Sequence, residues 1–126
     1  MQEHPNATLA RAGIDALNRG DMEAQAEMLA DDVVWHEIGN PEPIRGKAAL
    51  AERFASMPPG GSIAVEAHDV VANDDHTIAL VTATASMGGK SFTYRTAEIM
   101  HVRDGKITER WAFSDDTAAI IDFFSG

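Results

Sequence analysis

Cysteine is absent from the sequence, so the chain can form no disulfide bond, no thiolate zinc site and no cysteine nucleophile. Basic residues are scarce as well, because 10 Lys and Arg stand against 20 Asp and Glu and leave a formal net charge of −10. Nucleic acids and anionic membranes attract basic surfaces. We therefore expect neither of them as a partner.

The sequence also lacks long apolar runs, a basic-then-apolar start and any known cofactor motif. These absences predict a cytoplasmic protein that needs no cofactor. The chain has 126 residues, of which 44% are hydrophobic, and this is enough for the core of one domain. We expect that domain to span residues 1–126.

Hydrophobic periodicity predicts two helices, a strand, a third helix and then four strands. The first helix begins at a cap, Asn6 or Thr8, and ends near Gly20. The other expected helices cover about residues 22–30 and 46–57, and Pro58-Pro59-Gly60-Gly61 ends the last of them. Strands are expected at 33–38, 63–72, 77–86, 91–103 and 106–114, with a short terminal helix through Phe124. Helices gathered before an antiparallel meander indicate an α+β fold rather than a parallel α/β sheet.

The stretch from Asp31 to Gly46 is the most informative part of the sequence. Its strand alternates faces, so Trp35 and Glu37 point one way and His36 points the other. A large aromatic beside a carboxylate is typical of a ligand pocket that holds an acid or a base. An equally open interpretation makes Trp35 a core residue and Glu37 a solvated strand end.

The turn at Asp104-Gly105 decides which residues of the last strands face the pocket. A two-residue loop would place Trp111 beside Glu98, and a three-residue loop would place Arg110 there. We prefer the three-residue loop, because it pairs Glu98 with Arg110 across the strands. Tyr94 and Met100 then share this inner face.

The same choice leaves Ile99, Trp111 and Phe113 on the outer face of the sheet. An exposed apolar sheet face usually marks a partner surface, so we expect a homodimer formed through it. With inverted faces, His36, Arg95, His101 and Glu109 would converge on the pocket, and two histidines with a carboxylate could bind a metal. We expect no metal site, because a lone histidine on a strand is usually structural.

Four segments together resemble the nuclear transport factor 2-like superfamily, and within it the SnoaL-like group. They are Asn18–Ala24, Leu29–Trp35, Ile44–Leu50 and Val102–Ile107. The resemblance implies a cone-shaped α+β barrel, with N-terminal helices packed on a curved antiparallel sheet around an internal pocket. It implies no single function, because the group includes isomerases, cyclases, hydrolases and non-catalytic binders.

Two members of the superfamily can be compared residue by residue. The resemblance to ketosteroid isomerase places the general base on Glu37, but its two oxyanion donors fall on Gly13 and Met100, which cannot donate. The resemblance to limonene epoxide hydrolase places pocket residues on Trp35 and Glu37, but a catalytic aspartate falls on Ala112. We therefore expect neither of these standard reactions.

These observations predict a protein that binds a small apolar molecule. We expect an isomerase-, cyclase- or hydrolase-type enzyme in which Glu37 acts as general base on an apolar ring substrate. Its substrate-binding residues would be Trp35, Tyr94, Glu98, Met100 and Arg110. The alternative is a non-catalytic ligand-binding or dimeric interaction domain of the same fold.

Overall fold

The computed structural model describes residues 3–56 and 62–125 and contains one six-stranded sheet in the order β2-β1-β6-β5-β4-β3. All neighbouring strands are antiparallel except β1 and β6, which are parallel. The elements are α1 (Pro5–Asn18), α2 (Met22–Glu27), β1 (Leu29–Trp35), β2 (Ile44–Arg45), α3 (Lys47–Ala55), β3 (Ser62–Ala72), β4 (His76–Met87), β5 (Lys90–Arg103), β6 (Lys106–Ser114) and α4 (Thr117–Ser125).

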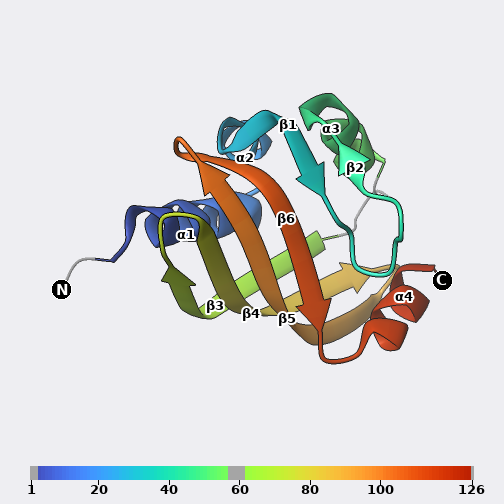
Figure 1. Ribbon diagram of the computed structural model, residues 1–126. Helices are drawn as coiled ribbons and strands as arrows, with labels where there is room; N and C mark the ends of the chain where they lie inside the picture. Colours follow the sequence, from blue (N-terminus) through green and yellow to red (C-terminus); the bar gives the residue numbers. More distant parts are fainter. Residues whose placement is uncertain (1–2, 57–61, 126) are drawn as a thin grey trace.

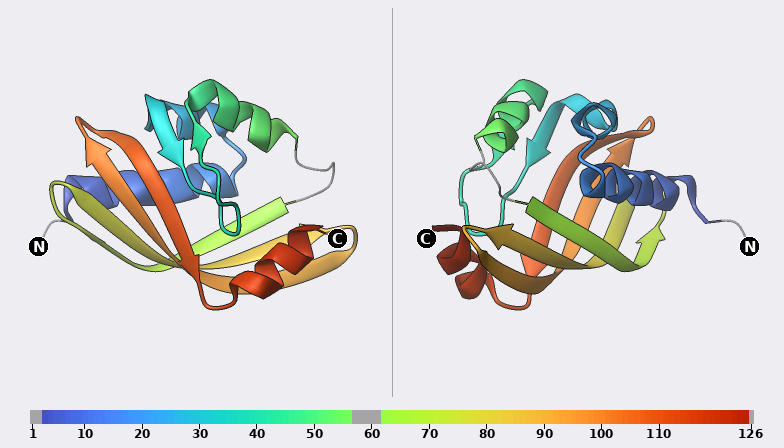
Figure 2. Two further views of the ribbon diagram at one scale, coloured as in Figure 1. Left: turned by 45° about the vertical axis from the view of Figure 1, so that its right-hand side comes forward. Right: turned by 180° about the vertical axis from the view of Figure 1, so that it is seen from behind.

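The sheet is curved and does not close into a barrel (Figure 1). Helices α1, α2 and α3 lie on its concave side, and α4 lies at one end of the sheet (Figure 2). This arrangement confirms the predicted α+β cone. Within residues 3–56 and 62–125, no helix is long and apolar enough to cross a membrane.

Several elements near the start of the chain differ from the prediction. Helix α1 begins at Pro5 and is capped by His4, not by Asn6 or Thr8. The second helix ends at Glu27, so β1 already begins at Leu29. The short strand β2 was not expected, because it forms only through its pairing with β1, where Trp35 lies opposite Ile44. The predicted stop at Pro58-Pro59-Gly60-Gly61 lies outside the described residues.

The hairpin between β5 and β6 differs from the predicted loop, but Arg110 still faces Glu98 as expected. Arg103 pairs with Lys106, so the loop has two residues, and the expected three-residue loop is wrong. The register shifts further along, where Val102 lies opposite Ile107 and His101 lies opposite Glu109. The extra residue, Thr108, forms a bulge that returns Arg110 to the face of Glu98.

Small side chains fill the space between the sheet and α1. Ala79 and Ala83 of β4 are buried beneath Ala7 and Ala10 of the helix. At the end of α1, the Asn18 amide donates to the Val65 carbonyl at 2.7 Å and accepts from the Val65 amide at 2.8 Å. Asn18 therefore joins α1 to the backbone of the edge strand β3.

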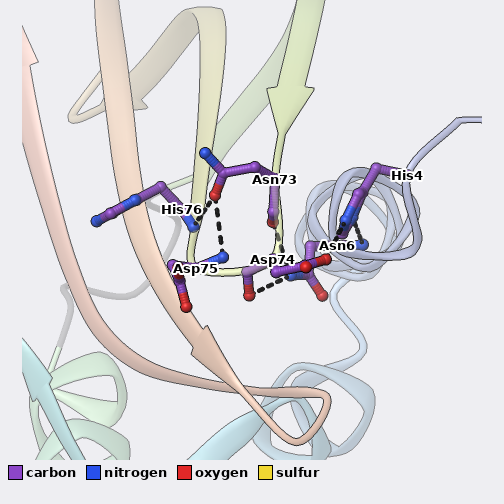
Figure 3. Close-up of polar contacts among 6 residues, drawn as sticks. All are labelled: His4, Asn6, Asn73, Asp74, Asp75 and His76. Atoms are coloured by element: carbon purple, nitrogen blue, oxygen red, sulfur yellow. Dashed lines mark hydrogen bonds and ion pairs between the residues drawn. The ribbon is translucent and has the colours of Figure 1, made fainter.

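Polar contacts fix the beginning of α1 to the β3–β4 turn (Figure 3). Asn6 Nδ2 donates to the carbonyls of Asn73 and Asp74 at 3.1 and 3.3 Å, and His4 Nε2 lies 3.0 Å from Asp74 Oδ1. The turn is held in its own shape because Asn73 Oδ1 accepts from the His76 amide at 2.8 Å. Helix α1 is thus attached to the sheet near both of its ends.

Candidate functional site

A cavity of about 230 Å³ lies between the helices and the concave face of the sheet. Most of its wall is apolar, with Ile14, Leu17, Met28, Phe54, Val65 and Met100 among the lining residues. Its polar lining residues are Gln25, Tyr94, Thr96, Glu98 and Arg110. An apolar cavity with a few polar groups is the usual composition of a small-molecule site.

Trp35, at the end of β1, forms part of the cavity wall. Its ring meets the ring of Phe54 from α3 edge to face, with centroids 6.0 Å apart. The Arg110 guanidinium lies 4.4 Å from the centroid of the Trp35 ring. Trp35 therefore contacts α3 through Phe54 and supports Arg110 by a cation–π contact.

Glu98 and Arg110 form the predicted ion pair on the wall of the cavity. Arg110 Nε and Nη2 both donate to Glu98 Oε1, at 3.2 and 3.0 Å. The remaining nitrogen, Nη1, donates to the His36 carbonyl at 3.2 Å. All three guanidinium nitrogens are thus engaged, whereas Glu98 Oε2 has no partner within the described part of the chain.

Tyr94 is the polar residue of β5 nearest to the mouth of the cavity. Burial raises the pKa of its phenol, and the negative charge of Glu98 raises that pKa further. The ring stacks on Phe92 at 5.6 Å and meets Phe124 of α4 edge to face at 6.4 Å. Tyr94 is therefore held in place as a neutral hydrogen-bond donor.

Glu37 lies at the mouth rather than on the wall of the cavity. Strand β1 ends at Trp35, so Glu37 stands in the following loop and lines an adjoining hollow. Its Oε2 lies 3.0 Å from Nε of Arg53. Tyr94 and Arg110 line both the cavity and this hollow, so the two spaces adjoin.

The histidines of interest lie on the opposite side of the sheet. His36 stacks on Trp111 with centroids 5.1 Å apart, and its Nε2 lies 2.8 Å from Glu109 Oε2. His101 meets the same Trp111 ring at 4.9 Å, and its Nδ1 lies 3.8 Å from Glu109 Oε1. His36, His101 and Glu109 thus converge on the outer face, and no group of three or more His, Cys, Asp or Glu among the described residues could hold a metal ion.

Gln25 is the cavity residue that the sequence analysis missed. On α2, the apolar Met22 does not face the cavity and is 50% exposed. Gln25 and Met28 line the cavity instead. The spacing of three between them was the available signal, but a glutamine on a short helix favours a solvent-facing interpretation.

Comparison with protein families matches residues 10–110 to the SnoaL-like domain. A comparison with curated protein sequences gave no match. Many solved structures are similar, among them Bal32a from a soil-derived mobile gene cassette, with 25% sequence identity, a TM-score of 0.86 and coverage of 95% of this chain and 96% of that one.

Two further similar structures have names that indicate a chemistry. One is a putative polyketide cyclase from Xanthomonas campestris pv. campestris, with 25% identity, a TM-score of 0.75 and 94% coverage of both chains. The other is an LEH-like epoxide hydrolase from M. tuberculosis. It has 22% identity and a TM-score of 0.79, and the match covers 88% of this chain and 83% of that one. At 22% identity, the similarity to the epoxide hydrolase supports a shared fold and not a shared reaction.

Proposed function

The chain belongs to the SnoaL-like domain family, and on this premise we propose that it is a small-molecule enzyme that catalyses proton transfer on an apolar ring substrate. The proposal rests on one observation: Tyr94 and Arg110 line both the apolar cavity and the adjoining hollow that holds Glu37. A ligand whose apolar part fills the cavity would bring its other end to Glu37, beside Tyr94 and Arg110.

In the proposed step, the Glu37 carboxylate removes a proton from a carbon next to a carbonyl group. The electrons of the C–H bond form an enolate, and its oxygen accepts a hydrogen bond from the Tyr94 hydroxyl. The raised pKa of Tyr94 favours this role, because the phenol keeps its proton. The ion pair with Arg53 orients the Glu37 carboxylate toward the mouth.

We assign the role of oxyanion donor to Tyr94, because Gly13 and Met100 cannot fill it. Gly13 and Met100 line the cavity, and they occupy the places that resemble those of the ketosteroid isomerase donors. Neither residue offers a side-chain hydrogen-bond donor. The proposed enzyme therefore uses a different donor geometry, and the similar putative polyketide cyclase favours an isomerase- or cyclase-type reaction.

The test is hydrogen–deuterium exchange at the carbon next to the carbonyl of small cyclic ketones, followed by NMR in heavy water. We expect Glu37→Gln to slow this exchange by about 10²-fold or more, because the general base is lost. Ligand binding, measured by calorimetry, should persist. Glu42→Gln is the matched control, because Glu42 is an exposed carboxylate in the same loop.

Two results would contradict the proposed reaction. Exchange that stays as fast in Glu37→Gln as in the wild type would remove Glu37 from the role of base. Ligand binding without any exchange above the uncatalysed rate would favour the alternative, a non-catalytic binding protein of the same fold.

We also propose that the chain forms a homodimer through the outer face of the sheet. Cross-strand pairing aligns Val71, Ile78, Ile99 and Trp111 in one row, and Leu80, Ala97 and Phe113 in the next. Phe113 is 60% exposed and Val71 is 52% exposed in the single chain. A second copy that covers these rows would remove this apolar surface from water.

A further inference from the structure

His36, the residue before Glu37, is held to strand β6 through both its backbone and its ring. Its amide donates to the Arg110 carbonyl at 2.9 Å, and its carbonyl accepts from Arg110 Nη1 at 3.2 Å. Its Nε2 lies 2.8 Å from Glu109 Oε2, and its ring stacks on Trp111 with an angle of 4° between the two planes. Consecutive residues of β6 therefore fix both the backbone and the side chain of His36.

The contacts of Glu37 itself go to other parts of the molecule. Strand β1 ends at Trp35, and Glu37 Oε2 lies 3.0 Å from Nε of Arg53 on α3. The Glu37 carbonyl accepts from the Asn40 amide at 3.2 Å, within the same loop. His36 therefore supplies the attachment to the sheet from which the Glu37 side chain projects.

From this geometry we infer that His36 is a positioning residue, whose ring on the outer face of the sheet helps to hold the Glu37 carboxylate at the mouth of the cavity. The inference rests on the proposed function, in which Glu37 is the base. The His36 ring lies beside Trp111 on the outer face, whereas Glu37 lines the hollow at the mouth. His36 therefore acts on the reaction through the backbone that joins it to Glu37, and not by contact with the ligand.

The ring contacts limit the movement of the strand end that carries the base. A carboxylate can only accept, so the His36 ring donates from Nε2 to Glu109. Proton abstraction requires the base within hydrogen-bond reach of the proton, and a displacement of about 1 Å can lower the rate by about 10²-fold. Loss of the ring contacts should therefore slow turnover, while the apolar wall that binds the rest of the ligand stays intact.

The test measures hydrogen–deuterium exchange of cyclohexanone and α-tetralone, which are cyclic ketones of one and two rings, and determines kcat and KM separately. We expect His36→Leu to lower kcat by about tenfold and to leave KM within about twofold of the wild-type value, because only the placement of the base changes. His36→Phe keeps a ring on Trp111 and loses the hydrogen bond, so it replaces the leucine variant if that variant folds poorly.

Substitution of Glu109 tests the same hydrogen bond from its other end. Glu109→Leu should lower kcat as His36→Leu does. Glu109→Gln should restore most of the rate, because its amide oxygen can still accept from His36 Nε2.

His101→Leu is the matched control on the same face of the sheet. The His101 ring lies 4.9 Å from the same Trp111 ring, and its Nδ1 lies 3.8 Å from the same Glu109 carboxylate. Its backbone belongs to β5 and does not lead to Glu37, so kcat should stay at the wild-type value. Because both histidines lie on the outer face, a change in self-association would affect both variants.

A double-mutant cycle separates positioning from a general structural role. In a Glu37→Gln background, His36→Leu should cause no further loss of the residual exchange, because no base remains to be placed. A general structural role would instead lower the residual exchange and the ligand affinity in both backgrounds.

The possible failures are distinguishable. A wild-type protein that exchanges neither ketone above the uncatalysed rate would overturn the proposed function together with this inference. Exchange that depends on Glu37 but stays as fast in His36→Leu as in the wild type would overturn the inference and leave the proposed function standing. An equal loss of kcat in His36→Leu and His101→Leu would do the same.

Discussion

Tyr94 is the single tyrosine of the chain, and its environment gives the site a donor of defined protonation state. Burial opposes the charged phenolate, and the nearby Glu98 carboxylate adds repulsion, so the pKa of the phenol is raised. The hydroxyl therefore keeps its proton throughout the neutral range. A group in this state can stabilise a developing negative charge without being consumed as an acid.

Because Tyr94 has no competitor of its own type, tyrosinate absorbance measures its pKa directly. We expect ionisation to occur above the ordinary value of 10.0, and Glu98→Gln should lower the pKa by removing the negative charge. A midpoint at or below the ordinary value would contradict the described environment.

The raised pKa also predicts the pH dependence of stability. The unfolded chain loses the tyrosine proton first, so the stabilising contribution is fully present below about pH 10 and is lost as the pH rises through the folded-state pKa. Urea unfolding should show a smaller alkaline loss of stability in Tyr94→Phe than in the wild type.

At the scale of elements, the sequence predicted those features that depend on residues close together in the chain. The change from helical to alternating periodicity located β3 to β6, and the pairing of Glu98 with Arg110 was anticipated from their chemistry. Strand β2 and the parallel pairing of β1 with β6 depend on contacts distant in sequence, so no local pattern indicated them. The bulge at Thr108 was not predicted either, although its effect on the facing residues matched the prediction.

The β5–β6 loop offers a clean test of turn chemistry. Asp104 and Gly105 have φ values of 52° and 74°, and a Cβ at Gly105 would meet no atom within 4 Å. Gly105→Ala should therefore lower the free energy of unfolding by about 1 kcal/mol through backbone strain alone. Asp104→Asn is the control, because asparagine tolerates this conformation and should leave the stability unchanged. Equal stability of both variants in urea titration would show that the loop conformation is not the one described.

At the scale of the whole molecule, the curved sheet has two faces with different roles. Its concave face lines the cavity, and its outer face carries the apolar rows that contain Trp111 and Phe113. His36, His101 and Glu109 lie beside these rows on the outer face. In the proposed assembly, ligand binding and self-association therefore use opposite sides of one layer.

The proposed dimer can be tested by introducing a single charged side chain at the proposed interface. Phe113→Asp should convert the dimer to a monomer in light scattering, because it buries a carboxylate at the centre of the proposed interface. Phe113 is exposed within a single chain, so the monomer should remain folded. Thr93→Asp is the control, because Thr93 is exposed outside the apolar rows, and it should remain dimeric. A wild-type protein that is monomeric at all concentrations would refute this assembly.

The Asn18 side chain has a consequence beyond the attachment of α1. A sheet that does not close has two open edges, and an open edge invites strand addition by other chains and growth into aggregates. Strand β2 has only two residues, which offers little template for such growth. The longer edge, β3, is interrupted by the register shift between Ala67 and Asp69, and the Asn18 amide already occupies the backbone groups of Val65. One side chain at the end of a helix thus helps to keep a sheet-forming chain from polymerising.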